Sequence, residues 1–262
     1  MSTKTQVHPS AVIDSKAEID SGVVIGPYCT IGPNVKIGKN TKLISHVVVD
    51  GDTQIGEANT VFPFAVLGAV PQDLKYKGET TKLIIGDRNQ IRECVTLNLG
   101  TVQGGGVTRV GSDNLLMAYV HLGHDCHIKN HTILANAVNV AGHVTIENYA
   151  SIGGMCGVTQ FVTIGEHTYF GGQSTIDRDV PPYCIALGQR PLSVKGANIV
   201  GLRRRGFSAD VITKINETIK LWTRPDVEKE RCLLEIESQY SEIAEIQKFI
   251  KFIRQSENGV AR

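Results

Sequence analysis

The chain of 262 residues carries 27 lysines and arginines against 26 aspartates and glutamates, with 27 glycines and only 6% aromatic residues. The balanced charge excludes a global attraction to nucleic acid or to an anionic membrane, so an acidic partner must meet a local basic patch. The glycine content and the scarcity of aromatic side chains favour a β architecture with many tight turns over a helix bundle.

The N-terminal stretch MSTKTQVHPS is polar, and no apolar run approaches the roughly 20 residues that a membrane-spanning helix needs. The six cysteines show no paired spacing. These features predict a cytoplasmic protein with free thiols and without a membrane span.

A large apolar residue recurs at every sixth position from Val7 to Leu67, and the period resumes from Ile85 to Leu97 and from Val110 to Ile176. A small or β-branched side chain usually stands two positions before it, and glycine often follows it. A period of six fits neither an α-helix nor a half-buried strand, but it fits a parallel β-helix in which each hexad forms one side of a triangular coil. Three hexads complete a coil, so residues eighteen positions apart are expected to stack.

Two segments interrupt the period, residues 68–82 (GAVPQDLKYKGETTK) and residues 98–108 (NLGTVQGGGVT). Both are rich in turn-forming residues, which predicts loops extruded from the β-helix. Beyond residue 181 the apolar spacing becomes helical, with Ser208 as a candidate N-cap. The sequence therefore predicts a mainly β protein, with a parallel β-helix domain at residues 1–181 and a small α-helical domain at residues 182–262.

The segment YVHLGHDCHIKN, residues 119–130, contains three of the chain's eight histidines. The hexad register turns Cys126 inward as core filling, whereas His121 and His124 are expected to point outward. Stacking at eighteen residues gathers one outward cluster: His121, His124, Asp125, Gly142 and His143, with Gln160 one coil further on.

Three interpretations of this cluster are open. In the first, it is a solvated polar face. In the second, His121, His124 and His143 bind zinc as in hexapeptide-fold carbonic anhydrases, where some of the histidines come from across a trimer interface. In the third, His124 is a general base and a backbone N–H near Gly142 stabilises an oxyanion. A glycine stacked beside a histidine leaves room for a substrate carbonyl, which favours acyl transfer.

Several segments together resemble the UDP-N-acetylglucosamine O-acyltransferases of lipid A biosynthesis, namely IGPYCTIGPNVKIG, QDLKYKGE, GTVQGGGVTRVGSDNLLM, HLGHDC, AGHVTI, IGGMCGVTQF and GLRRRGFS. Because QDLKYKGE, GTVQGGG and GLRRRGF lie outside the hexads, they separate this family from other hexapeptide transferases. The resemblance implies a left-handed prism and a homotrimer with active sites between subunits. It also implies transfer of a 3-hydroxyacyl chain from acyl carrier protein to the 3-hydroxyl of UDP-N-acetylglucosamine, with neither metal nor redox cofactor.

The resemblance also implies roles for individual residues. His124 looks like the general base, Asp125 its support and the Gly142 N–H the oxyanion donor. The implied substrate contacts are Gln72 and Asp73 for the sugar, Lys75, His121, His143 and Gln160 for positioning, Gly172 at the acyl-length position, and Asn198, Arg204 and Arg205 for the nucleotide and phosphate end.

Three details of this pattern carry further expectations. The small Gly172 predicts a long acyl donor, and the run Arg203–Arg205 predicts a basic rim for the acidic carrier protein. Thr159 stands where the family commonly has histidine, so the contacts to the acyl donor are expected to differ from the family pattern. Val200 stands where glutamate is common, so the contacts to uridine are expected to differ as well.

Two alternative functions are weighed against this one. The first is a hexapeptide acyltransferase for another nucleotide sugar, including a 3-amino sugar acylated at nitrogen. The second is a non-catalytic trimeric scaffold, which the clustering of His124, Asp125 and Gly142 argues against because a scaffold needs no base beside an open glycine.

Overall fold

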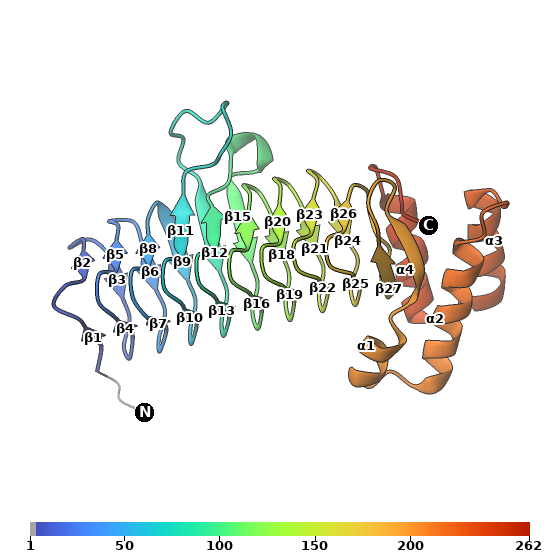
Figure 1. Ribbon diagram of the computed structural model, residues 1–262, viewed down its shortest axis with the longest axis horizontal. Coiled ribbons are helices and arrows are strands. Elements are labelled where there is room, and N and C mark those ends of the chain that lie inside the picture. The colour runs from blue at the N-terminus through green and yellow to red at the C-terminus, as the bar shows by residue number, and fades with distance from the viewer. Residues whose placement is uncertain (1–3) are drawn as a thin grey trace.

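The computed structural model describes residues 4–262, so the first three residues of the predicted β domain lie outside it. The chain winds as a left-handed parallel β-helix, a three-sided prism with four helices at its C-terminal end (Figure 1). The fold class predicted from the hexads is confirmed.

Each side of the prism is one sheet. The first sheet contains β1 (Gln6–Val7), β4 (Val24–Ile25), β7 (Lys42–Leu43), β10 (Thr60–Val61), β13 (Gln90–Ile91), β16 (Leu115–Leu116), β19 (Ile133–Leu134), β22 (Ser151–Ile152), β25 (Tyr169–Phe170), β27 (Cys184–Leu187) and β28 (Ser193–Ala197). The second contains β2 (Val12–Ile13), β5 (Thr30–Ile31), β8 (Val48–Val49), β11 (Val66–Ala69), β14 (Thr96–Asn98), β17 (His121–Leu122), β20 (Asn139–Val140), β23 (Gly157–Val158) and β26 (Thr175–Ile176). The third contains β3 (Glu18–Ile19), β6 (Lys36–Ile37), β9 (Asp52–Ile55), β12 (Lys82–Ile85), β15 (Val107–Val110), β18 (His127–Ile128), β21 (Thr145–Ile146) and β24 (Thr163–Ile164).

Parallel pairing stacks equivalent hexads of successive coils, as in the pairs Val7 with Ile25 and Leu134 with Ile152. The chain leaves this ladder between β11 and β12 and again between β14 and β15, where the 3-10 helix η1 (Val102–Gly104) forms. Both departures occur where the second sheet turns into the third, and Figure 1 shows the two loops standing out together there. We call this edge of the prism the loop edge.

The coil corners hold residues with left-handed backbone conformation, including Asp125 (φ 60°), His143 (φ 63°) and Phe161 (φ 66°) along the loop edge. Such a conformation costs a non-glycine residue about 1–2 kcal/mol. The parallel ladders on both sides of each corner stabilise it, and so do contacts between corner side chains of adjacent coils.

Asn59, Asn89 and Asn114 form a buried hydrogen-bonded ladder at the corners that lead into β10, β13 and β16 of the first sheet. The sequence pattern predicts small or β-branched side chains at these positions. The Asn89 amide nitrogen donates to the carbonyl of Gly111 at 2.9 Å and to Oδ1 of Asn59 at 3.0 Å. Its Oδ1 accepts from the backbone N–H of Asn114 at 2.9 Å. The ladder satisfies corner amides and carbonyls that no strand partner reaches.

Replacing Asn89 by alanine is expected to lower the free energy of unfolding by about 1–3 kcal/mol, because buried partners on two adjacent coils lose their hydrogen bonds. Urea unfolding of the purified protein measures this. Asn139→Ala is the control, since the exposed Asn139 side chain bonds only its neighbour Ala137. Equal losses in the two variants would contradict a stabilising role for the ladder.

The prism is capped by a hairpin and four helices. Strand β27 pairs in parallel with β25 and antiparallel with β28, so the first sheet continues past residue 181, and the domain boundary there stays a prediction. The helices are α1 (Ile199–Arg204), α2 (Ala209–Trp222), α3 (Lys229–Tyr240) and α4 (Ala244–Gln255). Ser208 caps α2 as predicted, accepting from the N–H of Val211. Across residues 4–262, none of the helices has the length and apolarity needed to cross a membrane.

Candidate active site

The loop edge gathers most of the residues predicted to form a site. One turn, between β17 and β18, carries His124 and Asp125, and the turn stacked on it, between β20 and β21, carries Gly142 and His143. The same edge also contains Gln160, in the turn between β23 and β24, and Gln72, Asp73 and Lys75, in the loop between β11 and β12. His121 lies on β17.

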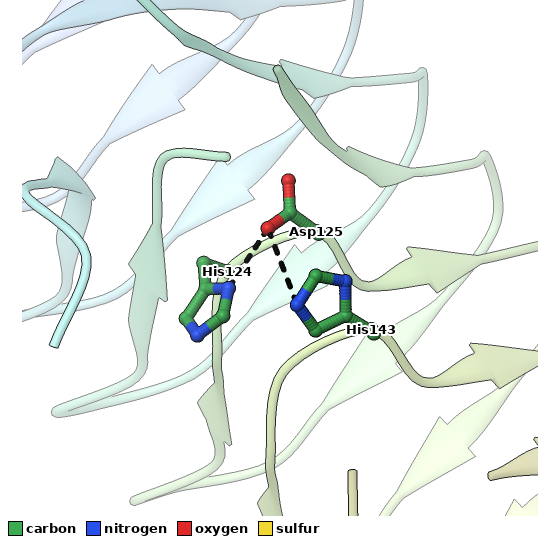
Figure 2. A group of neighbouring side chains, drawn as sticks. All are labelled: His124, Asp125 and His143. Carbon is green, nitrogen blue, oxygen red and sulfur yellow. Dashed lines mark hydrogen bonds and ion pairs between the residues drawn. The ribbon is translucent and has the colours of Figure 1, made fainter. Parts of the chain in front are cut away.

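Asp125 is the centre of the cluster. Its Oδ2 lies 2.8 Å from His124 Nδ1 and 3.8 Å from His143 Nε2, and Figure 2 shows the carboxylate between the two imidazoles. Thr101, at the start of η1, donates its backbone N–H to Oδ1 at 2.8 Å and its hydroxyl to Oδ2 at 2.6 Å. The loop approaches so closely that a Cβ on Gly104 would lie 2.0 Å from the Asp125 carboxyl carbon. Thr101 therefore fixes the carboxylate that orients His124.

The His124 side chain points outward at this corner of the prism. It is nevertheless only 8% exposed, because Gly142 and His143 pack against its ring. Since a carboxylate only accepts hydrogen bonds, a neutral His124 bonded to Asp125 carries its proton on Nδ1 and leaves the Nε2 lone pair available. A Cβ at position 142 would lie 2.6 Å from His124 Cε1. The predicted stacking of Gly142 on His124 is confirmed, and only glycine fits there without a shift.

Among residues 4–262, the Gly142 amide is a free N–H donor beside the His124 ring. The N–H groups of its two neighbours are used, since Ala141 donates to Val158 and His143 donates to the His124 carbonyl. No acceptor for the Gly142 N–H occurs in the part of the chain that the structure describes. A backbone N–H with no protein partner, next to a histidine nitrogen that accepts protons, is the arrangement that acyl-transfer chemistry requires.

The other two predicted histidines of the cluster, His121 and His143, differ in their surroundings. The His121 Nδ1 lies 2.7 Å from the Thr96 hydroxyl, and burial lowers the pKa of His121 below its usual value. Burial also lowers the pKa of His143, while the charge of Asp125 opposes that effect. Both rings are therefore neutral near pH 7, so each can donate or accept a hydrogen bond to an uncharged group.

For a zinc site, the structure brings together a different set of ligand atoms from the one predicted. His124, Asp125 and His143 each offer one atom within 4.8 Å of the others, whereas His121 bonds Thr96 instead. Both carboxylate oxygens of Asp125 already accept hydrogen bonds from Thr101, and His124 Nδ1 is bonded to Asp125. Because both Asp125 oxygens already accept hydrogen bonds, the set offers no free carboxylate ligand, which favours a hydrogen-bonded cluster over a metal site.

The predicted nucleotide end lies on a different part of the prism. Asn198, Arg204 and Arg205 line a cleft of about 510 Å³ over the first sheet, together with Tyr149 and other residues. The Arg205 guanidinium carbon lies 4.5 Å from the centre of the Tyr149 ring. Gly172 follows β25, at the edge between the first and second sheets. A single chain therefore does not bring these four residues to the loop edge.

The free energy of unfolding is expected to fall as the pH drops below about 6.5, the ordinary histidine pKa, because of the buried His167. Burial lowers the pKa of His167, which stacks between Tyr149 and Tyr183. The unfolded chain then binds the proton better, so the stabilisation is complete above the unfolded pKa and is lost as the pH falls through the folded one. His167→Phe keeps a ring in the stack and removes the titration.

Urea unfolding between about pH 7.5 and pH 5.5 tests this expectation on both proteins, and the wild type is expected to lose up to about 1.4 kcal/mol more per pH unit than the variant. The same pH dependence in both would show that His167 does not contribute.

Comparison with known proteins gives a consistent result over nearly the full length of the chain. A family model described as UDP N-acetylglucosamine O-acyltransferase, domain 2, matches residues 179–261, and a model for bacterial transferase hexapeptide repeats matches residues 4–39. The structure of LpxA from Acinetobacter baumannii is 46% identical with a TM-score of 0.94, and the match covers 98% of this chain and 99% of that one. The Moraxella catarrhalis UDP-N-acetylglucosamine O-acyltransferase is 44% identical, with a TM-score of 0.94 and coverage of 98% and 99%. The Arabidopsis UDP-N-acetylglucosamine acyltransferase is 32% identical, with a TM-score of 0.85 and coverage of 98% and 100%.

The hexapeptide prism, together with a buried histidine beside a free backbone N–H, defines an enzyme of the hexapeptide-repeat acyltransferase class. Identity at this level over nearly the full length narrows the class further. The chain belongs to the family of UDP-N-acetylglucosamine O-acyltransferases, which confirms the family predicted from its motifs.

Proposed function

We propose that this protein transfers a long 3-hydroxyacyl chain from acyl carrier protein to the 3-hydroxyl of UDP-N-acetylglucosamine, the first step of lipid A biosynthesis. The observation that carries the proposal is His124, whose Nε2 is available beside the unpaired Gly142 N–H. The Moraxella catarrhalis relative, named as a UDP-N-acetylglucosamine O-acyltransferase, supports the acceptor and the reaction class.

The reaction requires one base and one oxyanion donor. His124 Nε2 accepts the proton of the sugar 3-hydroxyl while that oxygen attacks the thioester carbonyl of the donor. The Gly142 N–H donates to the resulting oxyanion, and Asp125, held by Thr101, stabilises the imidazolium. When the carbon–sulfur bond breaks, His124 returns the proton to the departing thiolate, so an ester and a carrier thiol are formed. No step needs a cofactor.

The positions of the substrate-binding residues support a homotrimer with shared sites. The base lies at the loop edge, whereas Asn198, Arg204 and Arg205 line the cleft over the first sheet. One nucleotide sugar reaches both only if the cleft of one subunit faces the loop edge of the next. Gln72, Asp73 and Lys75 then hold the sugar, His121, His143 and Gln160 position it beside the base, and Asn198, Arg204 and Arg205 bind the nucleotide and its phosphates.

The surroundings of the cleft support the remaining parts of the proposal. Arg203 lines a second hollow beside α2, so the arginine run forms a basic rim for an acidic carrier protein. All six cysteines are free thiols, which supports location in the reducing cytoplasm.

Gly172 is expected to allow a long acyl donor, because a Cβ there would meet only Gly154 backbone atoms, the nearer at 3.2 Å. Gly172→Met fills this space, so we expect it to shift the preference toward shorter chains by about tenfold in relative kcat/KM. Competition between carrier proteins with long and short 3-hydroxyacyl chains measures the shift. An unchanged ratio would exclude Gly172 as a determinant of acyl length.

The proposal is tested by following thiol release from acyl carrier proteins with UDP-N-acetylglucosamine or its 3-amino analogue as acceptor. Rapid release with the hydroxyl sugar is expected. Release with the amino sugar alone would favour the N-acyltransferase alternative, and release with neither from a folded oligomer would favour a scaffold.

A further inference from the structure

Phe161 lies in the turn between β23 and β24, one coil after His143. Its ring stacks on the His143 imidazole, with 4.6 Å between the ring centroids and 12° between the planes. The residue is 53% exposed, so its ring also faces open space. Phe161 therefore borders the candidate active site without taking part in the steps described above.

The His143 ring has no hydrogen bond to hold it among residues 4–262. Its Nε2 is 3.8 Å from Asp125 Oδ2, which is too long for a hydrogen bond. Its remaining ring contact is edge-on to His124, with 5.0 Å between the centroids. Stacking on Phe161 is therefore the contact that fixes the plane of the imidazole.

Phe161 is itself held in place at its backbone. Its N–H donates to the Gly142 carbonyl at 3.3 Å, and its own carbonyl accepts from the Asn258 side chain. Asn258 belongs to the C-terminal segment, which is anchored on the prism where Ala261 donates to the Asp179 carbonyl at 2.8 Å. The C-terminal segment thus fixes the platform on which His143 rests.

We propose that Phe161 is a positioning residue for acyl transfer, holding the His143 imidazole in the plane that turns Nε2 toward Asp125. This inference rests on the proposed function, in which His143 positions the sugar. The titratable groups that face His143 are His124 and Asp125 from the adjacent turn and Asp73 from the loop between β11 and β12. Without the stacked ring, the imidazole is free to rotate, and its hydrogen bond to substrate is lost for part of the time.

Phe64 provides a matched control at another edge of the prism. It occupies the same kind of corner, with φ 65° against 66° for Phe161, and is 57% exposed against 53%. It also packs on a histidine eighteen residues earlier, His46, with 5.0 Å between the ring centroids. Phe64→Leu therefore matches Phe161→Leu in chemistry, backbone and exposure, but lies in a turn that carries none of the proposed site residues.

The test compares kcat for transfer to UDP-N-acetylglucosamine in Phe161→Leu, Phe161→Tyr and Phe64→Leu. Phe161→Leu is expected to lose about tenfold in kcat, because a mispositioned contact slows the reaction. Phe161→Tyr keeps the stacked ring and is expected to stay within about twofold of wild type, as is Phe64→Leu. Equal activity of Phe161→Leu and Phe64→Leu would overturn the inference.

A double-mutant cycle separates positioning from a general structural effect. If Phe161 acts through His143, Phe161→Leu causes no further loss of kcat in a His143→Ala background. An undiminished loss there would show that Phe161 acts by another route. The nitrogen resonances of the His143 imidazole give a readout without turnover, and they are expected to shift in Phe161→Leu but not in Phe64→Leu. Inactivity of the wild type would reject the proposed function, while these resonances would still decide whether Phe161 positions His143.

Discussion

Replacing His124 by alanine is expected to lower kcat by about 10³- to 10⁴-fold, because a positioned general base contributes up to this much and no other group takes its place. Asp125 bonds to His124 through Oδ2, but its oxygens also accept from Thr101 and lie behind the imidazole. The measurement is the rate of carrier thiol release at saturating substrate, with thermal unfolding as a check on folding.

His46→Ala is the control for this loss, since His46 packs between Tyr28 and Phe64 in tilted ring contacts at another edge of the prism. It is expected to retain wild-type kcat. If His124→Ala kept more than about a tenth of the activity while properly folded, His124 would not be the base.

Replacing Gly142 by alanine is expected to lower kcat by about 100-fold, because small displacements of a catalytic group have effects of this size. The added Cβ would lie 2.6 Å from His124 Cε1 and 2.8 Å from Nε2, so the ring must move away from the sugar hydroxyl. The same methyl group also narrows the space beside the Gly142 N–H. Steady-state kinetics should show the loss mainly in kcat, since the proposed nucleotide contacts line the cleft over the first sheet.

Gly157→Ala controls for the general effect of a methyl group on the prism, because a Cβ at Gly157 would meet no atom within 4 Å. It is expected to leave kcat within about twofold of wild type, as surface substitutions away from special features do. Similar losses in both variants would show that the close approach of Gly142 to His124 has no catalytic importance.

The hexad period was enough to predict the strands of the prism and the stacking within the cluster. Ile128 and Leu134, for example, each end a two-residue strand, and Gly142 lies against His124 as the spacing predicts. Parallel coils convert a fixed sequence distance into a fixed spatial one. For this reason, residues eighteen positions apart could be paired from the sequence without knowing the rest of the structure.

The Thr101 contact with Asp125 could not be predicted in this way, because Thr101 lies in a loop and the path of a loop does not follow the coil period. The three glycines after Gln103 gave a partial signal, since Gly104 must let the backbone approach the carboxylate. The position of Arg205 over Tyr149 likewise depends on how the helical part packs against the prism, which the hexads do not encode.

Two other features were present in the pattern and were missed. Asn59, Asn89 and Asn114 all stand two positions before a core residue, so their ladder could have been read from the spacing. Phe161 is eighteen residues after His143, and the stacking of their rings follows the same rule. Neither feature belongs to a motif of the site, because each contact depends on what lies on the neighbouring coil.

The most direct single measurement is the structure of the product formed from a long 3-hydroxyacyl carrier protein and UDP-N-acetylglucosamine, with His124→Ala in parallel. Mass spectrometry and NMR are expected to show one added acyl chain, in ester linkage at the 3-oxygen of the sugar, with wild-type protein, and unchanged sugar with the variant over the same time. Acylation at another position, or equal product from His124→Ala, would contradict a reaction in which His124 deprotonates the 3-hydroxyl.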